Sequence, residues 1–142
     1  MELGEVEDAE SADHFGWALV AGDFNGDGRD DLAIGVPDED RGNPTVSNAG
    51  GVHVLYGTAV GLRAANNQFW AQSNTQGGLE SQDRFGAALA AGNFNGDANN
   101  GISIDDLAIG VPNEDLGNPT VFQAGAVNVL YGTINRLAAT NN

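Results

Sequence analysis

The chain has 142 residues, of which 41% are hydrophobic, 21 are glycine and none is cysteine. Its formal net charge of 5 − 20 = −15 argues against nucleic acid or anionic membrane as a partner, because both need a basic patch. No apolar run approaches the roughly 20 residues of a membrane span, so we expect no membrane insertion.

A long segment of the chain occurs twice. Residues 15–28 match residues 85–98 at 10 of 14 positions, and residues 30–58 match residues 105–133 at 23 of 29. The copies lie 70 residues apart before an Asp/Asn-rich stretch and 75 apart after it, so the second copy carries five extra residues there. An internal repeat of this kind predicts two copies of one supersecondary unit.

In the first copy we expect short strands separated by turn residues. Phe15–Ala21 is small and apolar, which predicts a strand buried on both faces. Asp31–Val36 is an apolar run closed by Pro37, which cannot donate a ladder hydrogen bond. Gly51–Tyr56 alternates as a strand does, and a fourth strand is expected at Gln68–Gln72.

The second copy repeats the first three of these strands. They are expected at Phe85–Ala91, Asp106–Val111 and Ala126–Tyr131. Nothing like Phe69-Trp70 follows the last of them, and Met1–Val6 is a candidate to supply that strand to a neighbouring chain. The sequence therefore predicts an all-β fold of antiparallel meanders, each about 70 residues long.

The first Asp/Asn-rich stretch has the spacing of a cation-binding loop. Oxygen-bearing side chains stand at loop positions 1, 3, 5 and 9, which are Asp23, Asn25, Asp27 and Asp31, and the carbonyl of Arg29 stands at position 7. Hard oxygen ligands in this number suit Ca²⁺ better than Mg²⁺ or Zn²⁺. The alternative is an Asx-rich turn without metal, but three carboxylates packed together would repel one another without a cation.

The second loop is a weaker version of the first. Asn93, Asn95, Asp97 and Asp106 align with the first loop's side chains, so an amide replaces one carboxylate. The five extra residues lie within Asn99–Asp105, and their Asn-Gly pair must turn outward for the last carboxylate to reach the loop. We expect Ca²⁺ here with lower affinity, because ligand charge and loop rigidity set the dissociation constant; a metal-free turn is again the alternative.

Three motifs carry a family resemblance in each copy: a Phe-Gly pair, the acidic loop and a Gly-Val-Pro triplet. They are Phe15-Gly16, Asp23–Asp31 and Gly35-Val36-Pro37, and then Phe85-Gly86, Asn93–Asp106 and Gly110-Val111-Pro112. They resemble the Phe-Gly/Gly-Ala-Pro (FG-GAP) repeat of integrin alpha-chain β-propellers and their bacterial relatives, with Val in place of the family's Ala. The bacterial type is the better resemblance, and two repeats cover nearly the whole chain.

The resemblance implies one four-stranded propeller blade per repeat, with Ca²⁺ in the loop between its first and second strands. Blade 1 is then residues 1–67 with its outer strand completed by 68–72, and blade 2 is residues 73–142. The implied ligands are the loop residues already named: Asp23, Asn25, Asp27, Arg29 and Asp31, then Asn93, Asn95, Asp97 and Asp106. An extracellular or cell-surface location is implied as well.

A propeller closes with about four to eight blades, and two repeats supply only two. The chain is therefore expected to be either part of a longer array or a protomer that closes a ring with two or three further copies of itself, since a head-to-tail interface must close or polymerise. We favour the cyclic homo-oligomer of three or four chains.

No nucleophile–base motif is present, and His14 and His53 are isolated, so we do not expect an enzyme. The expected function is a calcium-binding propeller scaffold that mediates adhesion or protein–protein contacts. A carbohydrate-binding, lectin-type propeller is one alternative, and a non-catalytic fragment of a larger extracellular enzyme is another. A protein or glycan ligand is expected on the long loops opposite the calcium loops, because loops on a rigid sheet carry most binding sites. These loops are Asp38–Ala49, Ser73–Arg84 and Asn113–Ala124.

Overall fold

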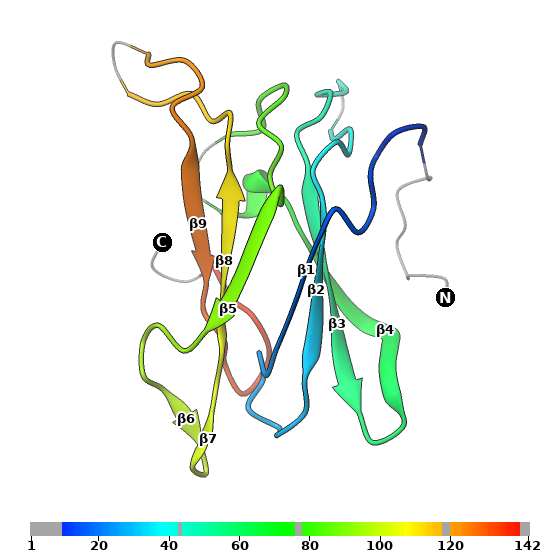
Figure 1. Ribbon diagram of the computed structural model, residues 1–142, viewed down its shortest axis with the longest axis vertical. Coiled ribbons are helices and arrows are strands. Elements are labelled where there is room, and N and C mark those ends of the chain that lie inside the picture. The colour runs from blue at the N-terminus through cyan, green and yellow to red at the C-terminus, as the bar shows by residue number, and fades with distance from the viewer. Residues whose placement is uncertain (1–9, 43, 76–77, 118–119, 140–142) are drawn as a thin grey trace.

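The computed structural model describes residues 10–42, 44–75, 78–117 and 120–139. Within these ranges it contains strands and one three-residue 3-10 helix, η1 (Gln72–Asn74). Two antiparallel sheets, one from each repeat, stand side by side (Figure 1). The all-β prediction is confirmed, whereas the expectation for Met1–Val6 falls outside the described residues.

We call residues 1–72 unit 1 and residues 73–142 unit 2. The first sheet belongs to unit 1 and has four strands in the order β1-β2-β3-β4. They are β1 (Ala18–Gly22), β2 (Asp31–Val36), β3 (Gly51–Thr58) and β4 (Gly61–Trp70). All neighbours are antiparallel, so unit 1 is the expected four-stranded meander.

The outer strand β4 begins at Gly61, so the predicted start at Gln68 was wrong. A two-residue turn after Thr58 folds the chain directly back on β3, with Thr58 opposite Gly61. The pairing register then shifts between Val54 and Tyr56, and this bulge hides the strand from a simple alternation of polar and apolar residues.

The second sheet belongs to unit 2 and has three strands in the order β5-β8-β9. They are β5 (Ala88–Gly92), β8 (Asp106–Val111) and β9 (Ala126–Leu130). Their register repeats that of unit 1, because Ala88 pairs with Gly110 where Ala18 pairs with Gly35. After β9, the described residues of unit 2 pair with that strand's end through an isolated bridge between Tyr131 and Ala138 and form no fourth strand, so the second four-stranded meander is incomplete there.

The five extra residues of the second loop form a small hairpin of their own. Strand β6 (Ala98–Asn99) pairs with β7 (Ile102–Ser103) across Asn100 and Gly101. Both turn residues have positive φ, 51° and 85°, as a type I′ hairpin turn requires. The predicted Asn-Gly turn is therefore confirmed.

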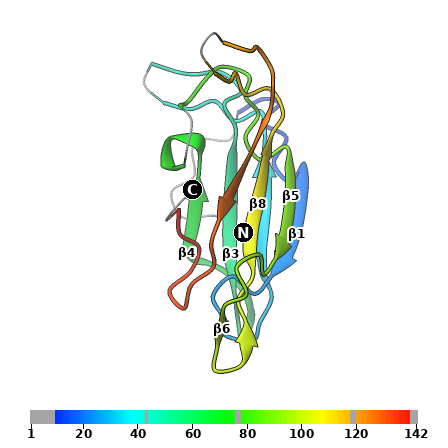
Figure 2. The same cartoon turned by 90° about the vertical axis from the view of Figure 1, so that its left-hand side faces the viewer.

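The first strand of each unit is not buried on both faces, as the sequence suggested. In β1 exposed and half-buried residues alternate, and Leu19 keeps 61% of its surface exposed. β1 is the edge strand of its sheet and lies beside β5 (Figures 1 and 2). The alternating exposure of its residues shows that one face of β1 is open.

One hydrophobic core serves both units. Its buried members come from the inner strands and loops of the two sheets and include Phe24, Val52, Val54, Phe85, Ile109 and Leu130. The two sheets therefore share one hydrophobic core.

The loops divide between the two ends of the molecule. The β1–β2 loop, the β3–β4 turn and the β6–β7 hairpin lie at the lower end in Figure 1, whereas the β2–β3 and β8–β9 loops lie at the upper end. This is the placement that alternating strand directions predict. No helix in the described ranges has the length and apolar character that a membrane crossing demands.

Candidate metal centre

The loop between β1 and β2 is organised by the carboxylate of Asp23. Its Oδ1 accepts hydrogen bonds from the backbone N–H groups of Gly26 (2.7 Å) and Asp27 (3.1 Å), and its Oδ2 accepts one from Gly28 (2.7 Å). Gly26 and Gly28 have φ of 67° and 80°, a conformation that side chains disfavour. The two glycines let the loop wrap tightly around one carboxylate.

Two further predicted ligands lie on the same turn. Asn25 Oδ1 accepts from the N–H of Asp27 at 3.0 Å, and Asp27 Oδ1 accepts from the N–H of Arg29 at 2.9 Å. The Arg29 guanidinium lies 3.3 Å from Asp27 Oδ2. These are the bonds of an Asx turn. Asn25 Oδ1 and Asp27 Oδ1 each accept one of them and have a second lone pair, so these two oxygens retain capacity to bind a cation.

Asp31 anchors the end of the loop in the protein interior. It is 1% exposed, and its carboxylate accepts from the N–H of Phe24 (2.9 Å) and of Gly57 in β3 (2.8 Å). Burial raises its pKa to about 6, and the neighbouring carboxylates of Asp23 and Asp27 add to the increase. The first loop therefore concentrates negative charge that the fold does not neutralise fully.

The second loop reproduces the first, with the amide of Asn93 in place of the Asp23 carboxylate. Asn93 Oδ1 accepts from the N–H of Gly96, while its Nδ2 donates to the Asp97 carbonyl. Buried Asp106 accepts from the N–H groups of Phe94 (2.8 Å) and Gly132 (2.9 Å), as Asp31 does in unit 1. The four predicted positions of this loop thus occupy equivalent places in the fold.

Asp97 carries an unsatisfied atom. Its Oδ1 is buried and has no hydrogen-bond partner, whereas Oδ2 accepts from the Asn95 amide at 3.2 Å. A buried carboxylate oxygen without a partner is costly, and a cation would satisfy it. The donors of both loops are oxygen atoms of the kind that Ca²⁺ prefers, so the donor chemistry fits this ion.

The described residues do not bring three or more acidic or histidine side chains together into a metal-binding cluster. Asp23, Asn25 and Asp27 instead face the backbone of their own turn, and Asp31 faces the interior. The structure thus places the predicted ligands on one loop in each unit, with suitable donors, without a converged cation site.

Two contacts that position the loops were missed in the sequence. Asp105, next to Asp106, accepts from the N–H of Asp23 (3.1 Å) and donates its own N–H to the Asp23 carbonyl (2.8 Å). Asn99 Nδ2 donates to the Gly26 carbonyl at 3.0 Å. The repeated Asp-Asp pair was the available signal for Asp105, whereas nothing marks Asn99 because the insertion has no counterpart.

A separate buried polar cluster lies near η1, away from the two acidic loops. Gln72, Asp83 and Glu114 are each at most 5% exposed, and Gln72 Nε2 donates to Glu114. Asp83 accepts from the N–H of Glu80 at 3.0 Å. Burial raises the pKa of Asp83 to about 6, with further increases from the charges of Glu114, Glu80 and Asp115.

We expect Asp83 to make stability fall as pH rises. Between its ordinary pKa of 3.8 and about 6, the folded chain keeps the Asp83 proton and the unfolded chain releases it, so the stabilisation is complete below this window and is lost as pH rises through it. Asp83→Asn should remove this contribution, which is at most about 1.4 kcal/mol per pH unit. Urea unfolding of both proteins across the window measures it; parallel pH profiles would contradict it.

Comparison with known proteins bears on the first unit most directly. Residues 15–55 match the FG-GAP repeat family. Over 119 residues the chain is 34% identical to the phosphatidylinositol-glycan-specific phospholipase D of Homo sapiens, and over 121 residues it is 33% identical to that of Mus musculus. Each match covers 83% of this chain but 13% of the relative.

The matched segment begins at the Phe-Gly pair, contains the whole acidic loop and ends in β3. An FG-GAP repeat implies a propeller blade, and the four antiparallel strands of unit 1 have the required topology. Residues 15–55 of this chain are therefore an FG-GAP repeat.

Proposed function

We propose that the chain is a non-catalytic, calcium-binding scaffold in which both units are FG-GAP propeller blades. The observation that carries the proposal is the oxygen-only donor set at equivalent places in the two loops, one of which holds the unpartnered Asp97 Oδ1. Asp23, Asn25, Asp27, the Arg29 carbonyl and Asp31 would hold one ion. Asn93, Asn95, Asp97 and Asp106 would hold the other.

Bound Ca²⁺ supplies the positive charge that offsets repulsion among the loop carboxylates. The chain's own residues supply the framework. Asp31 ties the loop to β3 through the Gly57 N–H, and Asp105 ties it to unit 2 through the Asp23 backbone. Order in the loop is thereby linked to contact between the units, which is the property a calcium-stabilised scaffold needs.

We expect millimolar calcium to raise the melting temperature relative to excess EDTA, because an ion that binds only the folded state stabilises it by mass action. Asp27→Ala should lose more of this calcium-dependent increase than Asp97→Ala, since the first loop has the larger number of carboxylates. Asp30→Ala, an exposed neighbour outside the donor set, is the control and should keep the full increase. Coinciding melts of the unmodified chain in calcium and EDTA would refute the proposal.

We place the binding surface for a protein partner on the long loops at the upper end of Figure 1, away from the calcium loops. A rigid sheet positions these loops, as it does in many binding proteins. Adhesion or protein–protein contact outside the cell is the proposed role. Binding to a glycan array but not to proteins would instead favour the lectin alternative.

A second candidate role follows from the relatives. They are named as phospholipases D, and the chain spans 13% of their length. We propose under this alternative that the chain is a non-catalytic part of a larger extracellular enzyme. It would then bind or orient a substrate whose chemistry takes place elsewhere, so the isolated chain should show no hydrolysis of a phosphatidylinositol-glycan.

We further propose that copies of the chain associate head to tail into a ring of three or four chains, since two blades do not close a propeller.

A further inference from the structure

The two units bury equivalent residues very differently. Phe85 in unit 2 is fully buried, whereas its counterpart Phe15 in unit 1 is 54% exposed. On the other side of the chain the difference is reversed, because Val52 in unit 1 is fully buried and its counterpart Val127 in unit 2 is 68% exposed. Each unit therefore has two contact surfaces, and the chain fills only one surface of each.

The filled contact is made by the backbone of residues 82–86 against residues 47–51. The N–H groups of Gln82, Arg84 and Phe85 donate to the carbonyls of Ser47, Asn48 and Ala49 at 2.8, 3.1 and 3.0 Å. This contact is a short parallel pairing, and it brings Phe85-Gly86 onto the surface of unit 1.

Glycine is required where this backbone crosses unit 1. A Cβ on Gly35 would lie 2.1 Å from the Gly86 carbonyl oxygen, and a Cβ on Gly50 would lie 2.3 Å from that of Phe85. A Cβ on Gly86 would lie 2.6 Å from the Gly51 carbonyl oxygen. The two backbones approach too closely to admit side chains.

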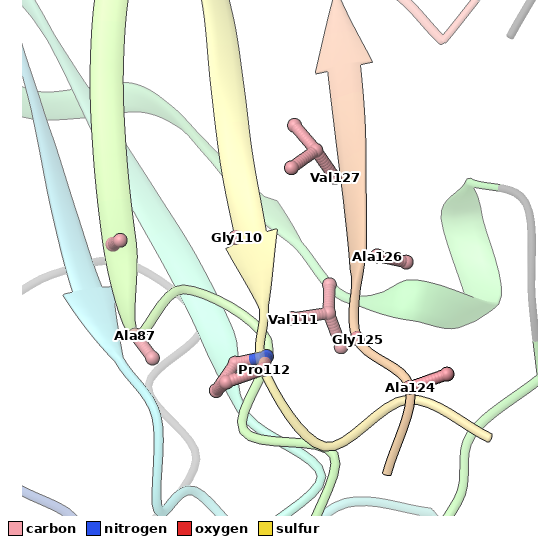
Figure 3. A pocket seen from close by; sticks show the side chains of 9 residues that line it. Ala87, Gly110, Val111, Pro112, Ala124, Gly125, Ala126 and Val127 are labelled. Carbon is pink, nitrogen blue, oxygen red and sulfur yellow. The ribbon is translucent and has the colours of Figure 1, made fainter. Parts of the chain in front are cut away.

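The equivalent surface of unit 2 is an open groove. Figure 3 shows it at the ends of β8 and β9, lined by small apolar residues that include Gly110, Gly125 and Val127. Gly110 corresponds to Gly35, yet the nearest atom to a Cβ there would be the Ala88 Cβ at 3.3 Å, with no crossing backbone. The chain itself thus gives no strong steric reason for glycine at 110, whereas an incoming backbone would.

Residues 12–16 are equivalent to residues 82–86, and they have the backbone conformation that residues 82–86 adopt against unit 1. Ala12, His14 and Gly16 have φ of 77°, 56° and 87°, and their counterparts Gln82, Arg84 and Gly86 have 71°, 60° and 90°. Positive φ at Ala and His is uncommon, so the agreement is not a default of the chain. The groove matches as well, with Gly125 at 77° and Gly50 at 84°.

We propose that Phe15-Gly16 of a second copy of this chain docks in the groove of unit 2 at Gly110, Gly125 and Val127. This inference rests on the proposed head-to-tail assembly and names its contact. The N–H groups of Ala12, His14 and Phe15 then donate to the carbonyls of Phe122, Gln123 and Ala124. No conformational change is needed on either side, which lowers the cost of binding.

The contact within the chain contains an ion pair that the proposed contact between copies lacks. Arg84 pairs with Asp38 of unit 1 through two bonds of 2.8 and 3.0 Å. The corresponding residues are His14 and Asn113. Within the chain, His14 Nδ1 lies 2.7 Å from Asp38 Oδ2 and Asn113 Nδ2 donates to the Gln82 carbonyl at 2.8 Å. Because Asn113 is uncharged, the two residues cannot form an ion pair between copies. The contact between copies is therefore mainly apolar and backbone-mediated, and the net charge of −15 on each copy makes it stronger at moderate salt than at low salt.

The test uses variants that disable one surface each. Phe15→Ser alters the docking segment, and Val127→Glu places a charge in the groove. Both positions are exposed in the single chain, so both variants should fold, as circular dichroism melts can verify. Val60→Ser removes an apolar side chain that is 73% exposed at the β3–β4 turn and is the matched control.

Sedimentation equilibrium in calcium and moderate salt gives the readout. The unmodified chain and Val60→Ser should sediment as three or four chains, whereas each surface variant alone should sediment as one. An equimolar mixture of the two variants at high concentration should yield a two-chain species, because one groove and one Phe15 segment remain intact. This complementation is the signature of a head-to-tail contact.

Three results would overturn the inference: an unmodified chain that stays single at high concentration, a surface variant that keeps the full assembly mass, or a variant mixture without the two-chain species. The proposed calcium function is tested separately, by melting single-chain Phe15→Ser in calcium and in EDTA. Failure of one proposal therefore leaves the other intact.

Discussion

Gly35→Ala is expected to destabilise the chain by about 3 kcal/mol or more, near the upper end for overpacked sites. The added Cβ would lie 2.1 Å from the carbonyl oxygen of Gly86 and 3.2 Å from its carbonyl carbon. Both are backbone atoms, so no side-chain rotation relieves the clash. The segment after Arg84 must move away from unit 1, and this uncovers the core around Phe85.

Urea unfolding at low protein concentration measures the effect. Gly110→Ala is the matched control, because it makes the same change at the equivalent place in unit 2, where the added Cβ would meet the Ala88 Cβ at 3.3 Å. Its loss should be below about 1 kcal/mol, as for a tolerated volume change. Equal losses for the two variants would show that the close approach of Gly86 to unit 1 is not a feature of the folded chain.

Asp31→Ala is expected to cost about 2 kcal/mol or more even in the presence of EDTA. The substitution leaves the buried N–H groups of Phe24 and Gly57 without their acceptor, at about 1 to 3 kcal/mol each. The substitution also removes a buried carboxylate, whose pKa is raised to about 6, and this offsets part of the lost stability. The residue thus has a structural role beyond any cation.

Unfolding in EDTA isolates this role, since calcium then contributes nothing. Asp31→Asn keeps an acceptor oxygen and should lose less than Asp31→Ala. The exposed neighbour Asp30, replaced by Ala, should stay within about 0.5 kcal/mol of the unmodified chain, as surface substitutions usually do. If Asp30→Ala and Asp31→Ala lose the same stability in EDTA, the two buried hydrogen bonds do not have the importance assigned to them.

The strands could be predicted because the repeat and the residues that end its strands are local features of the sequence. Pro37 and Pro112 mark the ends of β2 and β8, and the Asn-Gly pair marks the β6–β7 turn. The positions of the acidic loop residues follow from the same local spacing, because the loop folds around the carboxylate of Asp23.

What could not be predicted depends on contacts between distant segments. Leu19 and Leu89 occupy the same repeat position, yet Leu19 is exposed and Leu89 packs against the core. Leu89 lies on β5, which packs against β1 of the other unit, so this difference depends on how the two units are arranged and not on the repeated sequence. Likewise Asn99 reaches Gly26 across 73 residues, and no pattern within either loop reveals such a partner.

The hairpin on the second loop makes the two repeats non-interchangeable. Within one chain, Asn99 and Asp105 form hydrogen bonds with the first loop. The first loop has no such hairpin, so it cannot form the equivalent bonds with the second loop of another copy. A closed ring would then contain two kinds of interface in alternation. The interface between the two units of one chain has the contacts of Asn99 and Asp105, and the interface between neighbouring chains lacks them. Under dilution or mechanical load the ring should always dissociate at the interface between chains. It then releases whole chains in which the contact between the two units is intact.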